Sequence, residues 1–84
     1  MIGYGEDLSN MNLSRLNLAG ANLVRSDLQN STLEFTNLSR SSLDGSILNN
    51  ARLLRANLSQ VSMEDADLMG CDLSHADLSH ADLV

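Results

Sequence analysis

Leucine recurs at every fifth position along almost the whole of this 84-residue chain. The recurrence keeps one phase for sixteen units, with Met63 replacing leucine once, at Leu8, Leu13, Leu18, Leu23, Leu28, Leu33, Leu38, Leu43, Leu48, Leu53, Leu58, Met63, Leu68, Leu73, Leu78 and Leu83. On an α-helix of 3.6 residues per turn, a step of five advances about 140° and scatters these side chains around every face. On a flat strand an odd step sends successive leucines to opposite sides. A chain that bends once per unit in one sense buries them all, so the sequence predicts a solenoid with these sixteen residues as its core.

Two further positions of each unit repeat. A small residue usually stands two positions before the central residue, and Asp or Asn usually stands one before it. Short polar side chains hydrogen-bond nearby backbone groups in turns, which suits a chain that bends every five residues. Gly20, Gly45 and Gly70 all occupy the last position of their units, where we expect the bend to require φ > 0. These positions are interpreted as fold residues.

Units such as A-N-L-V-R, S-D-L-Q-N, A-D-L-M-G and C-D-L-S-H resemble the pentapeptide-repeat family, whose pattern is A-(D/N)-L-x-x. The resemblance covers residues 6–84 and leaves residues 1–5 as an N-terminal tail or partial cap, in which Ile2 and Tyr4 cover part of the first coil. It implies an all-β fold, a right-handed quadrilateral β-helix of about four coils with twenty residues each. Four coils at the spacing of neighbouring strands would be about 19 Å long.

Outward residues give independent support for a coil of twenty residues. Asn10, Asn30 and Asn50 share one such column, and stacked amides can hydrogen-bond from coil to coil. A coil of fifteen residues would instead stack Arg25, Arg40 and Arg55, which repel one another. We therefore expect four sides rather than three.

Composition excludes several functions. The chain has no apolar run long enough to cross a membrane, and no basic and apolar leader at its N-terminus. We therefore expect a cytoplasmic protein with Cys71 as a reduced, buried thiol. The formal charge is −6. Beyond residue 60 no Arg or Lys accompanies the acidic residues, which are Glu64, Asp65, Asp67, Asp72, Asp77 and Asp82. Such a chain should repel nucleic acid.

Catalytic, metal and cofactor sites are not expected. His75 and His80 stand one unit apart, hence on different sides of the square, and cannot converge on one zinc ion. The acids of the last units also fall one per side, as a girdle rather than a chelating cluster. A filled solenoid offers no pocket for a serine, a base and an orienting acid. We expect no enzyme activity, no metal and no cofactor.

Apolar residues at outward positions are the candidate partner surface. Phe35 and Leu54 share one side in consecutive coils, and Ile47 and Met69 share the adjacent side. Together they would form an apolar patch edged by Glu34, Arg52 and Arg55, and exposed patches of this kind mark contacts. The repeat pattern also runs unbroken to the C-terminus. An open coil there invites stacking, so we weigh an end-to-end homodimer equally with continuation in a longer protein.

The sequence therefore predicts a non-enzymatic structural or protein–protein interaction module with an unknown partner. One alternative is an acidic DNA mimic that binds DNA gyrase or another DNA-binding protein, as some members of the family do. Duplex DNA displays roughly eleven charges over 19 Å. This is about twice the net charge of the chain, and the difference weakens the DNA-mimic hypothesis. A second alternative is an idealised or truncated repeat chain with no activity beyond folding.

Overall fold

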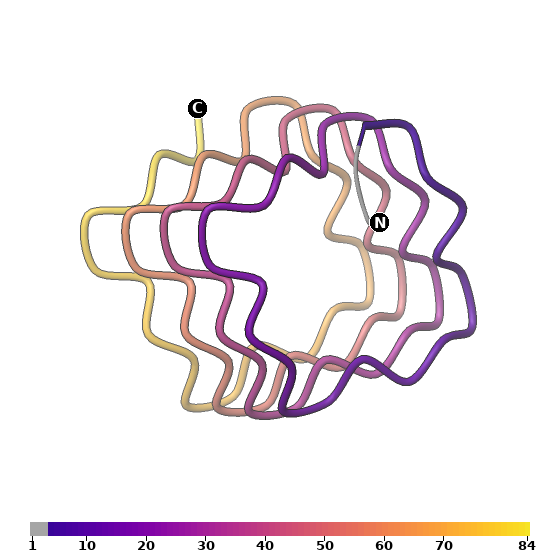
Figure 1. Ribbon diagram of the computed structural model, residues 1–84, viewed down its shortest axis with the longest axis horizontal. Helices are drawn as coiled ribbons and strands as arrows, with labels where there is room; N and C mark the ends of the chain where they lie inside the picture. Colours follow the sequence, from indigo (N-terminus) through magenta and orange to yellow (C-terminus); the bar gives the residue numbers. More distant parts are fainter. Residues whose placement is uncertain (1–3) are drawn as a thin grey trace.

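The computed structural model describes residues 4–84, and the chain winds through them as a stack of coils of nearly constant outline (Figure 1). Within this range there is no helix, and no strand is longer than a single bridged residue. The principal extents are 26 × 25 × 20 Å, and the view along the shortest axis looks down the solenoid. The 20 Å extent agrees with the length of about 19 Å expected for four coils.

Parallel β-bridges join residues that are twenty apart, and this spacing fixes the four-sided coil. Every bridged residue stands immediately before a central residue of the repeat. The bridges are Asp7–Asp27, Asn12–Thr32, Asn17–Asn37, Asn22–Ser42, Asp27–Ile47, Thr32–Arg52, Asn37–Asn57, Ser42–Ser62, Ile47–Asp67, Arg52–Asp72, Asn57–Asp77 and Ser62–Asp82. The expectation of twenty residues per coil is confirmed.

Each unit ends in a tight turn that creates a corner. The carbonyl of the central residue accepts a hydrogen bond from the N–H three residues further on, as in Thr36 N–H to Leu33 O at 3.2 Å. The third residue of each turn has φ between 57° and 74°, which is the pattern of a type II turn. Gly20, Gly45 and Gly70 adopt this conformation as predicted, but so do twelve residues other than glycine. Each of those twelve accepts a left-handed conformation that costs roughly 1–2 kcal/mol.

The repeat geometry begins before Glu6, the boundary drawn from the sequence. Gly5 has φ 67° and its N–H donates to the carbonyl of Val24 at 2.9 Å, as the equivalent residues from Asn10 to Gln60 do toward the next coil. Tyr4 is 61% exposed, and Ile2 lies outside the described residues. The solenoid therefore already includes Gly5.

The Asp or Asn before each central residue caps its own turn. Its side-chain oxygen accepts the backbone N–H two residues on, as in Asn12 with Ser14 at 3.1 Å. Unit 61–65 lacks such a residue because Ser62 stands at that position. Asp44 of the preceding coil replaces it, accepting the Glu64 N–H at 2.9 Å and the Ser62 hydroxyl at 2.6 Å. The turn role predicted from the sequence is confirmed.

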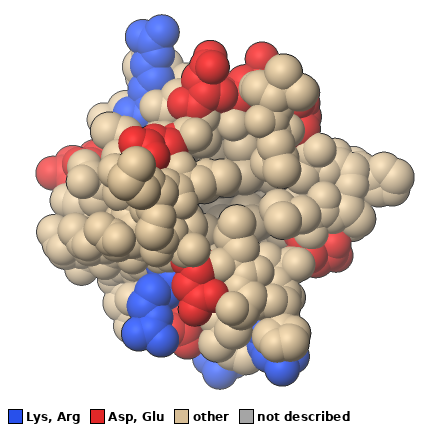
Figure 2. Space-filling model, turned by 180° about the vertical axis from the view of Figure 1, so that it is seen from behind, with Lys and Arg blue, Asp and Glu red and all other residues tan. Residues whose placement is uncertain are grey.

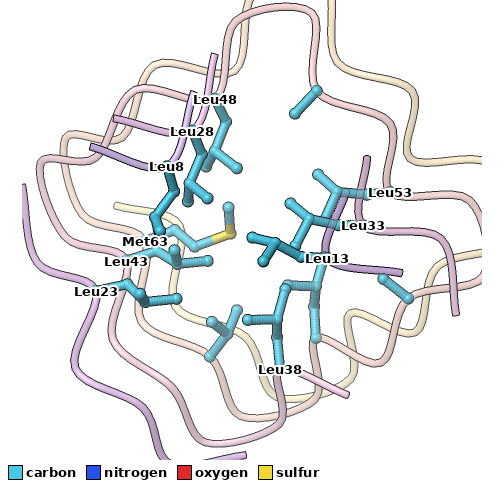
Figure 3. Close-up of a cluster of buried hydrophobic side chains, with 14 residues drawn as sticks. Leu8, Leu13, Leu23, Leu28, Leu33, Leu38, Leu43, Leu48, Leu53 and Met63 are labelled. Atoms are coloured by element: carbon cyan, nitrogen blue, oxygen red, sulfur yellow. The ribbon is translucent and has the colours of Figure 1, made fainter. Parts of the chain in front are cut away.

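The core is a column of central side chains that point into the coil from all four sides (Figure 3). Most are buried, including every central residue from Leu23 to Met63. Leu18, Leu68, Leu73 and Leu78 are partly buried. Leu83 is 52% exposed, so its assignment to the core was wrong: no further coil among the described residues packs on it.

Small polar residues line the core beside the leucines without leaving unpaired groups. The Ser31 hydroxyl donates to the carbonyl of Leu28 at 2.7 Å, and the Thr36 hydroxyl donates to the carbonyl of Leu13 at 2.8 Å. Among the described residues, no buried side-chain nitrogen or oxygen lacks a hydrogen bond. The hydroxyl groups of these buried serine and threonine residues are therefore accommodated in the core without an unpaired polar atom.

Candidate interaction surfaces

Phe35 and Leu54 lie together on one corner in adjoining coils. The Phe35 N–H donates to the carbonyl of Leu54 at 3.0 Å. The Phe35 side chain is 45% exposed, whereas Leu54 is half-buried. Beside them Arg52 forms an ion pair with Glu34, at 3.3 Å between Nη2 and Oε2. The structure therefore brings this predicted pair together with two of its three predicted charged neighbours.

Ile47 and Met69 lie on the preceding side of the square. Ile47 bridges to Asp67, two residues before Met69. Ile47 is 38% exposed and Met69 is 74% exposed, so both side chains meet solvent. Each pair joins adjoining coils, and the turn from Leu68 to Cys71 separates the two sides. The apolar surface thus consists of two pairs around a corner.

Arg15 belongs to this surface and was missed from the sequence. Its guanidinium carbon lies 4.6 Å from the centroid of the Phe35 ring, a cation–π contact worth about 0.5–1 kcal/mol at an exposed site. Arg15 precedes Phe35 by one coil of twenty residues. This spacing of twenty residues between a cation and an aromatic residue is the sequence signal for the contact.

A second feature missed from the sequence is a surface hollow of about 230 Å³. Gly45 has no side chain to fill the space between Arg25 and Asp65 in its column, and Asp44 and Glu64 line the same hollow. Asp44 is already committed to the Ser62 hydroxyl and the Glu64 N–H. These bonds hold the pKa of Asp44 below its usual value, and the Ser62 bond is the larger cause. The hollow is lined by one basic residue, Arg25, and by three acidic residues, Asp44, Glu64 and Asp65.

The histidines and acids of the last coil are spread over separate sides. Asp67, Asp72, Asp77 and Asp82 each end a different ladder of bridges, one per side. Within residues 4–84 no group of three His, Cys, Asp or Glu side chains could hold a metal ion. Charged side chains lie around the rim of the molecule seen along its axis (Figure 2).

Two serines of the last coil donate hydrogen bonds to the acidic residues beside them. The Ser79 hydroxyl donates to Asp77 at 2.6 Å. This bond and then the Ser79 N–H lower the pKa of Asp77, and Ser74 acts in the same way on Asp72. Cys71 is half-buried, with its thiol donating to the Leu48 carbonyl at 3.1 Å, and burial raises the pKa of this thiol. The serine and aspartate side chains therefore stabilise turns, and the Cys71 side chain packs against the core.

Comparison with known sequences decides the family. A profile for pentapeptide repeats, present in eight copies, matches residues 7–45, 36–74 and 51–84. The chain belongs to the pentapeptide-repeat family. No curated protein sequence matches it significantly.

Solved structures of pentapeptide-repeat proteins share its fold, the right-handed quadrilateral β-helix. Rfr23 from the cyanobacterium Cyanothece 51142 is 32% identical over 93% of the chain, with a TM-score of 0.72. A protein from Nostoc PCC 7120 is 29% identical over 88%, with a TM-score of 0.66. A protein of the Arabidopsis thaliana thylakoid lumen is 26% identical over 92%, with a TM-score of 0.60. The present chain covers 60%, 58% and 57% of these three proteins respectively.

Membrane insertion through helices has no support in the part of the chain that the structure describes. No helix there is long and apolar enough to cross a bilayer. One of the similar proteins comes from the thylakoid lumen, so family membership by itself does not assign a compartment.

Proposed function

We propose that this pentapeptide-repeat protein is a non-enzymatic interaction module that binds a partner protein through the corner formed by Phe35, Leu54, Ile47 and Met69. Members of the family are generally structural or interaction modules, which supports the general class. The location of the surface and the identity of the partner are the specific parts of the proposal. We propose the cytoplasm as its compartment, as expected from the sequence.

Phe35 carries the proposal. It occupies a corner with φ 60°, where glycine or asparagine would be accommodated at lower cost. Its ring is nearly half exposed, so it contributes less burial to the core than an inward residue does. A bulky aromatic side chain in a strained and exposed position is a reason to infer function rather than packing.

The surroundings of Phe35 fit a binding anchor. Aromatic residues and arginine are enriched where interfaces derive most of their energy. The stacked Arg15 guanidinium restricts the ring before any partner arrives, which reduces the ordering cost of binding. The ion pair of Arg52 with Glu34 supplies a polar edge to the apolar pair. The partner is therefore expected to present an apolar cavity with acceptor groups around it.

The experiment compares three forms of the chain as baits in an extract of the source organism. F35S/L54S removes the pair, and Y4S/V24S is the matched control, because Tyr4 and Val24 are also an outward aromatic and aliphatic pair in one column. Wild type and Y4S/V24S should retain the same partner, and F35S/L54S should lose it with an unchanged melting temperature. Retention of that partner by F35S/L54S would refute the proposal. Unfolding of F35S/L54S would instead assign the pair to the core.

A further inference from the structure

The two ends of the solenoid expose different hydrogen-bonding groups. In each unit the N–H of the central residue donates toward the next coil, as Leu8 does to Asp27 at 2.7 Å, and so does the N–H of the turn residue, as Asn10 does to Gln29 at 2.9 Å. Only one N–H per unit donates in the other direction, as Asp27 does to Glu6 at 2.9 Å. Two donors per unit therefore face the C-terminal end, while two acceptors per unit face the N-terminal end.

These groups have no backbone partner within residues 4–84. At the C-terminal end they are the N–H groups of Asp65, Leu68, Gly70, Leu73, His75, Leu78, His80 and Leu83, with the carbonyls of Ala66, Cys71, Ala76 and Ala81. At the N-terminal end they are the carbonyls of Asp7, Ser9, Asn12, Ser14, Asn17 and Ala19, with the N–H groups of Asp7, Asn12 and Asn17. One edge is rich in donors and the other is rich in acceptors.

The side chains at the two ends also differ in size. Met11 and Leu16 occupy positions that hold small residues in later coils, and they are 44% and 43% exposed. The equivalent positions of the last coil are all small: Ala66, Cys71, Ala76 and Ala81. Because the coil has four equal sides, stacking in any quarter-turn register places Met11 and Leu16 over Ala or Cys.

We propose that the 84-residue chain associates head to tail, with the C-terminal edge of one copy stacked on the N-terminal edge of the next. In this arrangement the N–H groups at the Leu68 and Gly70 positions of each unit meet carbonyls of the next copy. The N–H groups at the Asn12 position of that copy meet carbonyls at the Cys71 position. The parallel ladder then continues across the junction with the hydrogen bonds found inside each copy. Large side chains of one edge fill the spaces left by small ones of the other.

A contact between two C-terminal edges satisfies fewer groups. Antiparallel pairing could join the N–H groups of the central residues, such as Leu68, to the carbonyls of the small residues two positions earlier, such as Ala66. The N–H groups of Gly70, His75 and His80 would then have no acceptor. Such a contact would also bring together two coils that contain six acidic residues each and no arginine or lysine. Like charges across an interface oppose association. The head-to-tail contact instead places this acidic coil against the first coil, where Arg15 offsets one of the two acidic residues Glu6 and Asp7, so the repulsion is weaker.

The proposal differs from the closed homodimer considered from the sequence. A head-to-tail contact does not close, so copies add indefinitely, each lengthening the rod by about the 20 Å of one copy. The end outline of 26 × 25 Å is about 650 Å², somewhat below the roughly 800 Å² per partner of standard interfaces. Association is therefore expected to be moderate and concentration-dependent.

Sedimentation velocity of the wild-type chain over a concentration series tests the proposal. The average mass should rise past that of a dimer without reaching a plateau. M11E/L16E blocks the N-terminal edge at exposed positions, and Q29E/Q60E adds the same charge on the sides as a control. M11E/L16E should sediment as a monomer, and Q29E/Q60E should behave as wild type. Circular dichroism of both variants checks that the fold is unchanged.

A mixture of two blocked variants separates the alternatives. L83E/V84E blocks the C-terminal edge, again at exposed positions, and alone it should be a monomer. Mixed with M11E/L16E, it should form a 1:1 dimer and nothing larger, because one free edge of each kind remains. A wild-type chain that stays monomeric or stops at a dimer would overturn the proposal. So would self-association of M11E/L16E, since that requires contact between identical C-terminal edges.

Discussion

Truncation of a leucine should destabilise the solenoid in proportion to the number of coils that cover it. Leu38 has no exposed surface, and coils lie on both sides of it. Leu38→Ala should therefore lower the free energy of unfolding by about 2–5 kcal/mol, from lost burial and the cavity left behind. Leu83 occupies the same position of its unit but is 52% exposed. Leu83→Ala removes about half as much buried surface and leaves no enclosed cavity, so we expect about 1 kcal/mol.

Thermal unfolding followed by circular dichroism measures the difference directly. For a domain of this size, 1 kcal/mol corresponds to about 4–8 °C in Tm. Leu38→Ala should lower Tm by at least about 8 °C, and Leu83→Ala by no more than about that amount. The two variants share the same chemical change and the same repeat position. Equal losses for both, or a loss at Leu38 smaller than at Leu83, would refute the reasoning that stability depends on neighbouring coils.

The remaining predictions concern pH and the corners. Serine hydrogen bonds lower the pKa of Asp72 and Asp77 in the folded state. Their stabilising contribution is therefore present above the unfolded-state pKa near 4 and is lost as pH falls through the lower folded-state pKa values. Tm should be level between pH 8 and 5 and should fall below about pH 4. A rise of Tm below pH 4 would contradict the stabilising role of these hydrogen bonds. Gly70→Ala should cost roughly 1–2 kcal/mol for φ 74° plus a clash with the Asn50 side chain, whereas Gly20→Ala meets no atom within 4 Å and should cost only the backbone part. Urea denaturation of both variants measures the difference, and equal losses would show that Asn50 moves aside freely.

The architecture could be predicted from the sequence because one constraint is repeated in every unit. A five-residue period of Leu excludes helix and flat strand, and columns of Asn twenty residues apart favour four sides. The turn role of residues such as Asn12 was likewise predictable, since their side chains act on backbone only two residues away. Local chemistry repeated many times leaves little freedom.

Contacts between particular coils were harder to predict. The Arg15–Phe35 contact and the Asp44 cap on Glu64 each join residues about twenty apart and occur at single places in the stack. Leu83 fits the repeat perfectly, yet its burial depends on what lies beyond it rather than on its own unit. A sequence period identifies the position that a residue occupies, whereas these features depend on which residue stands in the neighbouring coil.

The most direct test of the twenty-residue coil is an engineered disulfide. In a Cys71→Ala background, Asn37→Cys and Asn57→Cys replace two residues bridged in adjoining coils. Neighbouring strands lie about 4.8 Å apart, within the 4.4–6.8 Å between Cα atoms that a disulfide accepts. Under mild oxidation at low protein concentration, monomers of this variant should lose both free thiols. The control, Asn37→Cys with Arg52→Cys, spaces the thiols fifteen apart and should keep both; closure of the control pair in place of the twenty-residue pair would contradict the account.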